Sequence, residues 1–378
     1  MCGSFGSASV TRRGVLGGVA AGLALPGAAA AVATAATTAE ARPPGRRGMR
    51  VVLLGTAGGP PAHADRAGIA SAVVVDGATY LVDVGRAALT QYVRAGLTLA
   101  DLRAVFVTHL HADHVADYFN LFLLGGHLAP SQGDGLTGAV PVHGPGPAGG
   151  LPPTFGGGTS PTTNPDDPTP GLRALTDYCA DAFAYSTNLF MRDSHTRQTR
   201  DLVDVREIET PAAATYQNTA PATAPFTVFE DDRVRVRATL VPHGPAFPAF
   251  AFRFDSDHGS VTFSGDTTYS DNLIALAHRT DLLVHEAINV VGFDGPPALV
   301  DHLLAGHVEV QKVGPVAQRA QAGRLVLSHV GDLAAPVIDR RTWVRWASRG
   351  YDGPVRVGND LDTFTVRPSG PRATGAPR

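Results

Sequence analysis

The chain has 378 residues, 44% of them hydrophobic and 17% charged, so it is long enough for one large α/β domain or two ordinary domains with a sizeable core. Its formal net charge is −3, and the body of the chain contains no cluster of Lys and Arg. This composition argues against the basic surface that most nucleic-acid binders carry, and we expect no nucleic-acid partner.

The N-terminal segment has the layout of a cleaved twin-arginine export signal, expected over residues 1–41. Arg12 and Arg13 precede an uncharged stretch rich in Ala and Gly, which ends in Ala-x-Ala-like sites before Arg42. A transmembrane anchor is the alternative, but small residues outnumber Leu and Ile here. We therefore expect a periplasmic or extracellular protein without a stable membrane anchor. Cleavage would remove one of the two cysteines and leave Cys179 as the single thiol, without an intramolecular disulfide.

Apolar runs separated by turn residues predict strands and helices in the first part of the chain body. Residues 51–54 form an apolar run that ends at Gly55, and Gly77 and Ala78 separate the next two runs as a turn would. The expected strands are 51–54, 70–76, 80–84 and 104–107, and the expected helices are 87–96 and 115–124.

Residues 126–224 are interpreted as an insertion over one face of the fold. Segments 144–170 and 210–225 are rich in Pro and Thr and lack an apolar period, which predicts surface loops. A helix at 172–189 and a strand at 203–208 are expected between them. Because long loops in compact domains usually serve as lids or binding loops, we expect a lid region here.

The rest of the chain repeats the order of strands followed by helices. The expected strands are 226–230, 234–241, 250–254, 260–264, 282–285, 325–328 and 363–366, and the expected helices are 273–277, 308–322 and 336–347. Two halves of this kind predict an α/β fold, a four-layer α/β/β/α sandwich, in one domain over residues 49–368.

A cluster of metal-ligand residue types follows the expected strand at 104–107. Alternate residues of an extended segment point the same way, so His109 and His111 can face one ion. Where the chain turns into a helix, Asp113 and His114 can reach a second ion. Imidazole nitrogen and carboxylate oxygen are ligands that zinc accepts. The alternative is a polar loop in which Asp113 caps a helix.

This His-x-His-x-Asp-His arrangement after an apolar strand resembles the metallo-β-lactamase superfamily, over about residues 51–366. Six further motifs resemble the branch that contains ribonuclease Z and a set of secreted arylsulfatases. They are Leu54-Gly55-Thr56-Ala57-Gly58-Gly59-Pro60, Leu81-Val82-Asp83-Val84-Gly85, Val241-Pro242-His243-Gly244, Ser264-Gly265-Asp266-Thr267, His285-Glu286-Ala287 and Leu327-Ser328-His329.

The resemblance implies a dinuclear zinc site with two Zn²⁺ per chain. One zinc would be held by His109, His111 and His243, the other by Asp113, His114 and His329, and Asp266 would bridge both. Asp83 would support the ligand loop without touching a metal. Two neighbouring ions lower the pKa of a shared water, so a metal-bound hydroxide is the expected nucleophile. The alternatives are a loop histidine without function at 243, a packed strand-end histidine at 329 and a helix-capping aspartate at 266.

The resemblance assigns protonation of the leaving group to His307, partnered with Glu286, and the catalytic residues are thus Asp113, Glu286 and His307. His302 is a competitor for the acid role. We favour His307 because it is expected to open a helix and because its spacing to the last ligand fits the branch. Glu286 has the alternative of a structural strand-end carboxylate. Two further histidines, at positions 127 and 143, flank the insertion and are candidates for the pocket lining.

The expected substrate is a small sulfate or phosphate ester, as for an arylsulfatase. Ribonuclease Z of bacteria carries a tRNA-binding arm between the motifs that match His243 and Asp266, and here the two dozen residues between them suffice only for two strands. The slightly negative net charge and the expected export signal also argue against tRNA processing. Alternatives are a ribonuclease Z-like phosphodiesterase or nuclease, a lactonase or β-lactamase, and a non-enzymatic binding protein, which the complete ligand set disfavours. A homodimer is compatible with the sequence. The sequence does not identify the physiological substrate.

Overall fold

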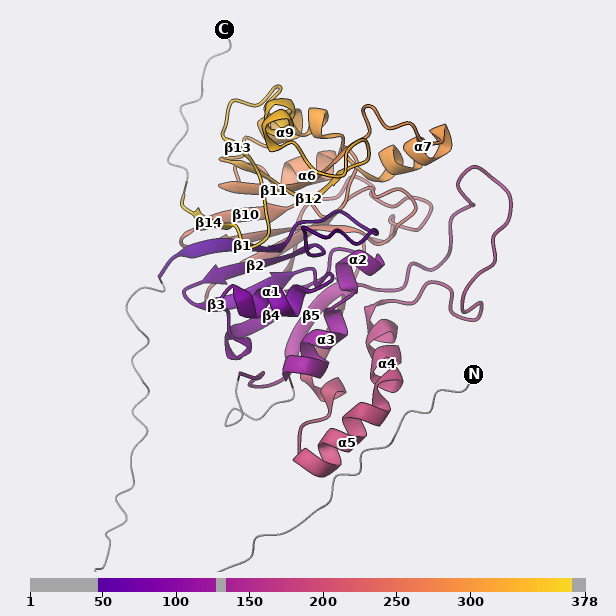
Figure 1. Cartoon of the computed structure of the whole chain (residues 1–378), viewed down its shortest axis with the longest axis vertical. Helices are drawn as coiled ribbons and strands as arrows, with labels where there is room; N and C mark the ends of the chain where they lie inside the picture. Colours follow the sequence, from indigo (N-terminus) through magenta and orange to yellow (C-terminus); the bar gives the residue numbers. More distant parts are fainter. Residues whose placement is uncertain (1–46, 127–133, 369–378) are drawn as a thin grey trace, which may run out of the picture. The chain divides into compact units, whose positions relative to one another are not determined.

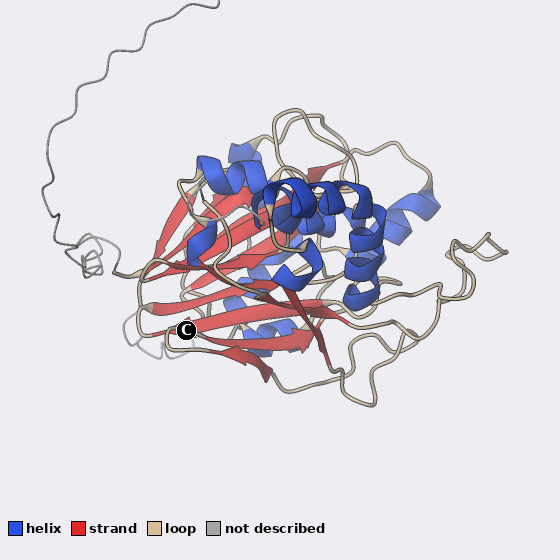
Figure 2. Cartoon of the chain, turned by 90° about the horizontal axis from the view of Figure 1, so that it is seen from below, coloured by secondary structure: helices blue, strands red, loops and turns tan. Residues whose placement is uncertain are grey.

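The structure is a computed structural model that describes residues 47–126 and 134–368, so the expected export signal lies outside the described residues. Two β-sheets pack face to face, and helices cover the outer face of each sheet (Figures 1 and 2). This arrangement confirms the predicted four-layer α/β/β/α sandwich. In the described part of the chain, no helix combines the length and the apolar character needed to cross a membrane.

The first sheet has seven strands, and a parallel group forms one side of it. In spatial order the strands are β14 (Thr363–Val366), β1 (Met49–Gly55), β2 (Ala70–Val75), β3 (Ala78–Val82), β4 (Leu102–Phe106), β5 (Val140–Pro145) and β6 (Val203–Ile208). β1 pairs antiparallel with β14 and β2, whereas β3 to β6 are parallel. The carboxyl ends of β3, β4 and β5 therefore meet at one edge of this sheet.

The second sheet also has seven strands and repeats the division into antiparallel and parallel groups. In spatial order they are β13 (Val355–Val357), β12 (Leu325–Asp332), β11 (Leu282–Asn289), β10 (Gly259–Phe263), β9 (Phe250–Ser256), β8 (Arg235–Leu240) and β7 (Phe226–Glu230). β10 to β13 are parallel, and β7 to β10 pair antiparallel.

Alternation along the strands builds three apolar layers. In β1, Val51 and Leu53 face the core between the sheets, whereas Val52 and Leu54 face the helices outside. In β9, Phe250, Phe252 and Phe254 all enter the core between the sheets. Since consecutive side chains point to opposite faces of a sheet, these strands bury one set of apolar residues between the sheets and the other set under the helices.

Helices from both halves of the chain cover the sheets. The layer on the first sheet includes α1 (Ala88–Arg94), α2 (Ala112–Val115), α3 (Tyr118–Asn120) and α4 (Leu172–Ala182), followed by α5 (Ala184–Ser194). The layer on the second sheet consists of α6 (Asp271–Leu276), α8 (Val313–Arg319) and α9 (Arg340–Ala347). α7 (Pro297–Gly306) contributes only Gly306 as a buried residue.

The segment expected as an insertion supplies part of the first sheet. Residues 126–224 contain β5, which was not expected, and β6, which was. The expected helix 172–189 is two helices, α4 and α5, that meet at Phe183. The part that lies outside the sandwich is thus smaller than expected, and its main piece is the 146–171 loop between β5 and α4.

Three helical assignments also change. The expected helix 115–124 is split between α2, α3 and a wider π-helical turn at Leu121–Gly126. The expected helix 308–322 shortens to α8 after one 3-10 turn, and α7 precedes it unpredicted. His307 therefore follows α7 in extended backbone, and the expectation that it opens a helix is wrong.

Phe106 tests how far the stability depends on the core between the sheets. Its ring is fully buried and lies against Phe229, Phe252 and Phe254, with ring centroids 5.2–5.7 Å apart. We expect Phe106→Ala to lower the free energy of unfolding by about 3–5 kcal/mol, because it removes these contacts and leaves a cavity. Chemical denaturation followed by circular dichroism measures the change.

Tyr185→Ala is the control, since that aromatic residue is 81% exposed on α5. We expect it to change the free energy by less than about 0.5 kcal/mol. Equal effects of the two substitutions would contradict the assignment of the core.

Candidate metal centre

The predicted ligands lie where strands of both sheets end at a common edge. His109, His111, Asp113 and His114 follow β4, and the other three come from the second sheet: His243 after β8, Asp266 after β10 and His329 within β12. The structure brings all seven together, in groups whose ligand atoms lie within 4.8 Å of one another. Their assignment to individual ions stays a prediction.

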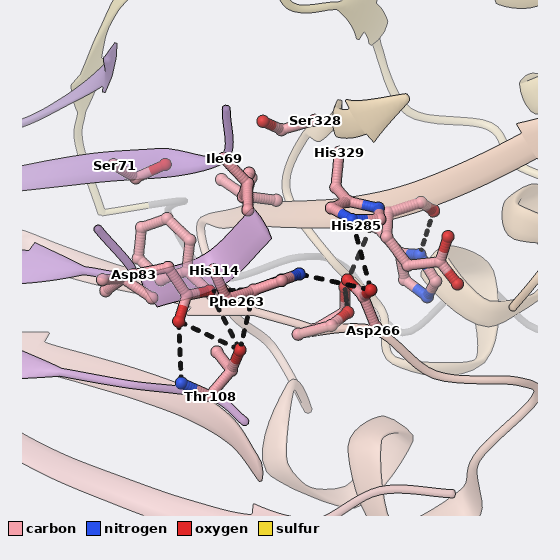
Figure 3. Close-up of a pocket in the computed structure, with 15 residues that line it drawn as sticks. Ile69, Ser71, Asp83, Thr108, His114, Phe263, Asp266, His285, Ser328 and His329 are labelled. Carbon is pink, nitrogen blue, oxygen red and sulfur yellow. Dashed lines mark hydrogen bonds and ion pairs between the residues drawn. The ribbon is translucent and has the colours of Figure 1, made fainter. Parts of the chain in front are cut away.

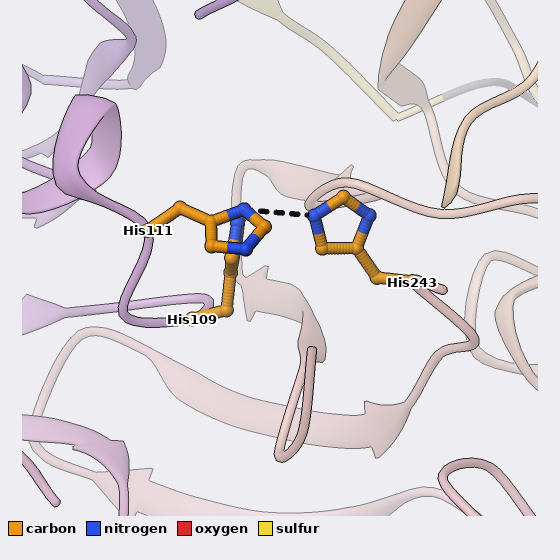
Figure 4. A group of neighbouring side chains, drawn as sticks. All are labelled: His109, His111 and His243. Atoms are coloured by element: carbon orange, nitrogen blue, oxygen red, sulfur yellow. Dashed lines mark hydrogen bonds between the residues drawn. The ribbon is translucent and has the colours of Figure 1, made fainter. Parts of the chain in front are cut away.

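His109, His111 and His243 form the first group (Figure 4). Nε2 of His243 lies 3.1 Å from Nδ1 of His111, and Nδ1 of His243 donates to the carbonyl oxygen of Gly306 at 2.8 Å. This donation leaves the lone pair of Nε2 facing the group. Burial lowers the pKa of His243 to about 3, so its ring is neutral at pH 7, as a metal ligand must be.

Asp113, His114 and His329 form the second group. Oδ2 of Asp113 lies 3.3 Å from Nε2 of His329 and 3.6 Å from Nε2 of His114. Burial would raise the pKa of Asp113, but the bond from His329 and the charge of His114 outweigh it and lower the pKa to about 2. The carboxylate is thus ionised and can act as a ligand.

Asp266 lies between the two groups (Figure 3). Its Oδ2 atom is 3.3 Å from Nε2 of His114 and 3.2 Å from Nε2 of His329, both of which point toward it. The same oxygen is 3.8 Å from Nε2 of His109 and also 3.8 Å from Nε2 of His243. Asp266 therefore reaches both groups, as a bridging carboxylate would.

Unpaired buried atoms in these groups fit a metal ion. Nε2 of His109, Nε2 of His114 and Oδ1 of Asp266 are buried without a hydrogen-bond partner among the described residues. Leaving such atoms unpaired is costly, and neutral imidazole nitrogens with carboxylate oxygens are the donors that zinc prefers. The residues present therefore fit the expected metal.

Asp83 orients the ligand loop through two contacts of its carboxylate. Its carboxylate accepts from the backbone N–H of Thr108 at 2.8 Å and lies 2.9 Å from Nδ1 of His114. With Nδ1 of His114 engaged in this way, Nε2 is directed at the site. Asp83 adopts a left-handed φ of 58°, and His329 one of 53°. Backbone strain of this kind costs on the order of 1–3 kcal/mol and typically occurs at functional positions.

Two glycines beside the ligand loop, Gly59 of the opening motif and Gly85, have a steric cause. A Cβ atom on Gly59 would lie 2.1 Å from Oδ2 of Asp113, which no real side chain could tolerate. A Cβ on Gly85 would lie 2.3 Å from the backbone oxygen of the same residue. Glycine at both positions therefore lets two backbone segments pack directly against Asp113.

Glu286 and His307 form a pair beside the ligand groups. Oε2 of Glu286 lies 3.4 Å from Nδ1 of His307, while Oε1 accepts from the backbone N–H of Val308 at 2.8 Å. Burial lowers the pKa of His307, but the nearby Glu286 carboxylate outweighs it and raises the pKa to about 9. The Glu286 carboxylate thus favours the protonated form of His307, the form that a proton donor needs.

The remaining candidates lie elsewhere. His302, on α7, is outside the ligand groups, and its ring contacts Phe155 with centroids 5.0 Å apart. His143 stacks on Phe106 with centroids 5.2 Å apart, and burial lowers its pKa to about 4, so it is a core residue. His127 lies outside the described residues. No pattern in the sequence marks Phe155, because it stands in a loop rich in Gly, Pro and Thr.

Comparisons with known proteins agree with this geometry. Residues 65–126 match the family model described as the metallo-beta-lactamase superfamily. Ribonuclease Z from Mycobacterium bovis (strain BCG / Pasteur 1173P2) is 28% identical over 321 residues, which cover 85% of this chain and 99% of that protein. This chain is a metal-dependent hydrolase of ester bonds with the metallo-β-lactamase fold.

Solved structures share the fold of this metallo-β-lactamase-fold hydrolase. The short form of human tRNase Z has a TM-score of 0.54 at 21% identity, covering 84% of this chain and 99% of that one. Zn²⁺-bound PqqB from Methylobacterium extorquens has a TM-score of 0.52 at 14% identity, covering 84% of this chain and 100% of that one. The expected enzyme class is confirmed, and the alternative of a non-enzymatic binding protein is set aside.

Two expectations about the substrate are wrong. The curated relatives are ribonuclease Z proteins that align over nearly their whole length, which overturns the expected arylsulfatase-like preference for small sulfate or phosphate esters. The same finding overturns the expectation of no nucleic-acid partner. The spacing between His243 and Asp266 is short, since only β9 and β10 lie between them. A short spacing at this place does not by itself exclude an RNA substrate.

Asp83 should control metal affinity without being a ligand. We expect Asp83→Ala to weaken zinc binding by roughly 10–100-fold, because His114 loses the carboxylate that orients its ring. Competition with a chromophoric chelator measures the affinity. Asp76→Ala is the matched control, since Asp76 also contacts a histidine, His258 at 2.9 Å, but at the opposite end of β3. Unchanged affinity in Asp83→Ala would refute the role.

Proposed function

We propose that this protein is a phosphodiesterase of the ribonuclease Z type, which hydrolyses phosphodiester bonds in RNA. The observation that carries the proposal is the His307–Glu286 pair beside the two ligand groups. A phosphodiester with a sugar leaving group needs a proton as its bond breaks, and this pair holds one there. The alignment with mycobacterial ribonuclease Z over 85% of this chain supports the same substrate class.

Seven residues would hold two zinc ions. His109, His111 and His243 would bind one ion, Asp113, His114 and His329 the other, and Asp266 would contact both. When bound, the ions would supply Lewis-acid activation of the attacking water and of the phosphodiester.

Two residues of the chain, His307 and Glu286, would then supply the proton for the leaving group and hold it in position. A ring nitrogen of His307 lies within 4.8 Å of ligand atoms of His243 and Asp266, close to where the scissile bond would lie. His307 would donate its proton to the departing sugar oxygen. Glu286 would stabilise the charged imidazole until that transfer and would hold the ring in place through its bond to the N–H of Val308.

The substrate class can be tested with purified, zinc-supplemented protein. We expect it to cleave an RNA with a 3′ trailer and bis(p-nitrophenyl) phosphate, to lose both activities with a chelator, and to regain them with zinc. Elemental analysis should give two ions per chain. Hydrolysis of p-nitrophenyl sulfate with no activity on either diester would overturn the proposal, and a single ion would overturn the dinuclear site.

His307→Ala should separate proton donation from metal binding. Both zinc ions should remain, and turnover on RNA should fall by roughly 10²–10⁴-fold, the usual effect of a positioned acid. The loss on bis(p-nitrophenyl) phosphate should be much smaller, because nitrophenolate departs without a proton. His329→Ala is the comparison, and it should lose a metal and activity on every substrate. An equal loss on both substrates in His307→Ala would refute the acid role.

We also propose that residues 1–41 direct twin-arginine export, so that the RNA would be met outside the cytoplasm. Support comes from Arg12 and Arg13 before a long uncharged segment. Replacing both arginines with Lys should retain the protein, uncleaved, in the cytoplasm, as fractionation would show. Normal export of the double variant would refute this proposal.

A further inference from the structure

A cavity of about 1030 Å³ opens beside the first ligand group, and His109 and His111 are part of its wall. Most of the remaining wall comes from the 146–171 loop, from residues 245–248 after β8, and from His302 on α7. Five further residues complete it: Leu110, Ala112, Val115, Pro145 and Leu175. In Figure 1 this loop runs outward from the sandwich after β5 before it returns to α4. Because the cavity shares two histidines with the metal centre, any group bound in it adjoins the bond being cleaved.

The wall of this cavity contains no Lys, Arg, Asp or Glu among the residues that the structure describes. It consists mainly of Pro, Gly, Thr and apolar residues such as Leu151, Phe155 and Phe247. A chain of phosphates would find no counter-charge here, apart from the metal centre itself. The wall therefore favours an uncharged ring, and the volume is ample for one.

Phe155 offers a surface on which such a ring can stack. It is 49% exposed, although it is a large apolar side chain within a loop of small residues. Gly156, Gly157 and Gly158 follow it with φ angles of 79–87°. Glycine adopts this left-handed conformation at little steric cost, so the chain can turn directly after Phe155. The edge-to-face contact with His302, at 71°, supports Phe155 from α7.

We propose that this cavity binds the nucleobase next to the scissile phosphodiester, stacked on Phe155, with His302 as the residue that positions Phe155. The inference rests on the proposed function and adds to it a contact between the protein and a base of its RNA substrate. Proteins that bind single-stranded RNA use exposed aromatic side chains in this way, since every base has a π-face. His302 then has a role in binding, and the proton donor is His307 alone.

The test compares the dinucleotide UpU with two analogues, each of which has a hydrogen in place of one base. Phe155→Ala should lower kcat/KM for UpU by roughly 5–150-fold, the loss of one stacked base, and should leave it unchanged for the analogue that lacks that base. Phe155→Trp should retain activity on UpU. Phe190→Ala is the matched control, because Phe190 is 47% exposed on α5, outside the cavity wall.

His302 is tested by two substitutions. His302→Ala should lower kcat/KM for UpU in the same direction as Phe155→Ala, and His302→Phe should restore it, because a phenyl ring keeps the contact but cannot donate a proton. Failure of His302→Phe to restore activity would overturn the positioning role.

The outcomes separate the two proposals. Wild-type protein that cleaves neither UpU nor RNA would overturn the proposed function, and the inference with it. Wild-type protein that cleaves UpU, combined with no effect of Phe155→Ala or an equal loss on all three compounds, would overturn the base-binding site alone.

Discussion

Four imidazole nitrogens converge on one buried carboxylate oxygen, Oδ2 of Asp266, at distances of 3.2–3.8 Å. The rest of the structure depends on maintaining this convergence, because crowded and unpaired polar atoms are unfavourable inside a protein unless a cation accompanies them. The four histidines come from segments at the strand ends of both sheets, so neither sheet alone could assemble the site. The core between the sheets, with its closely packed phenylalanines, fixes the distance between the two halves. Strained backbone at Asp83 and His329 adds a local cost that this packing offsets.

The fold class and the gathering of the ligands could be predicted because both depend on strands. Apolar runs between turn residues marked most strands to within one or two residues at their starts, and the ligand residues follow those runs. Parallel strands then bring distant residues to one edge without further information. β5 at Val140–Pro145 escaped prediction because Gly and Pro interrupt its apolar pattern, and α7 because it begins in a Gly-Pro-Pro sequence typical of a turn.

Other features required contacts between segments that the sequence does not connect. The orientation of His243 comes from the carbonyl of Gly306, and the pairing of Phe155 with His302 joins a loop to a helix about 150 residues away. The spacing of His307 from His329 pointed to a residue that does lie beside the ligand groups, although its expected backbone was wrong, and its role as the acid stays a prediction. What places His307 is Glu286, whose carboxylate contacts both its ring and the N–H of the next residue.

The net charge of −3 misled the expectation about nucleic acid because it averages over the whole chain and does not report the charge at a single site. A basic stripe is needed when many phosphates are held along a duplex or a long strand. An enzyme that acts on one phosphodiester needs positive charge only at that bond. Two zinc ions with the carboxylates of Asp113 and Asp266 would give the centre a charge of about +2, since +4 and −2 combine there. An uncharged cavity beside that centre fits a base, and the combination needs no Lys or Arg.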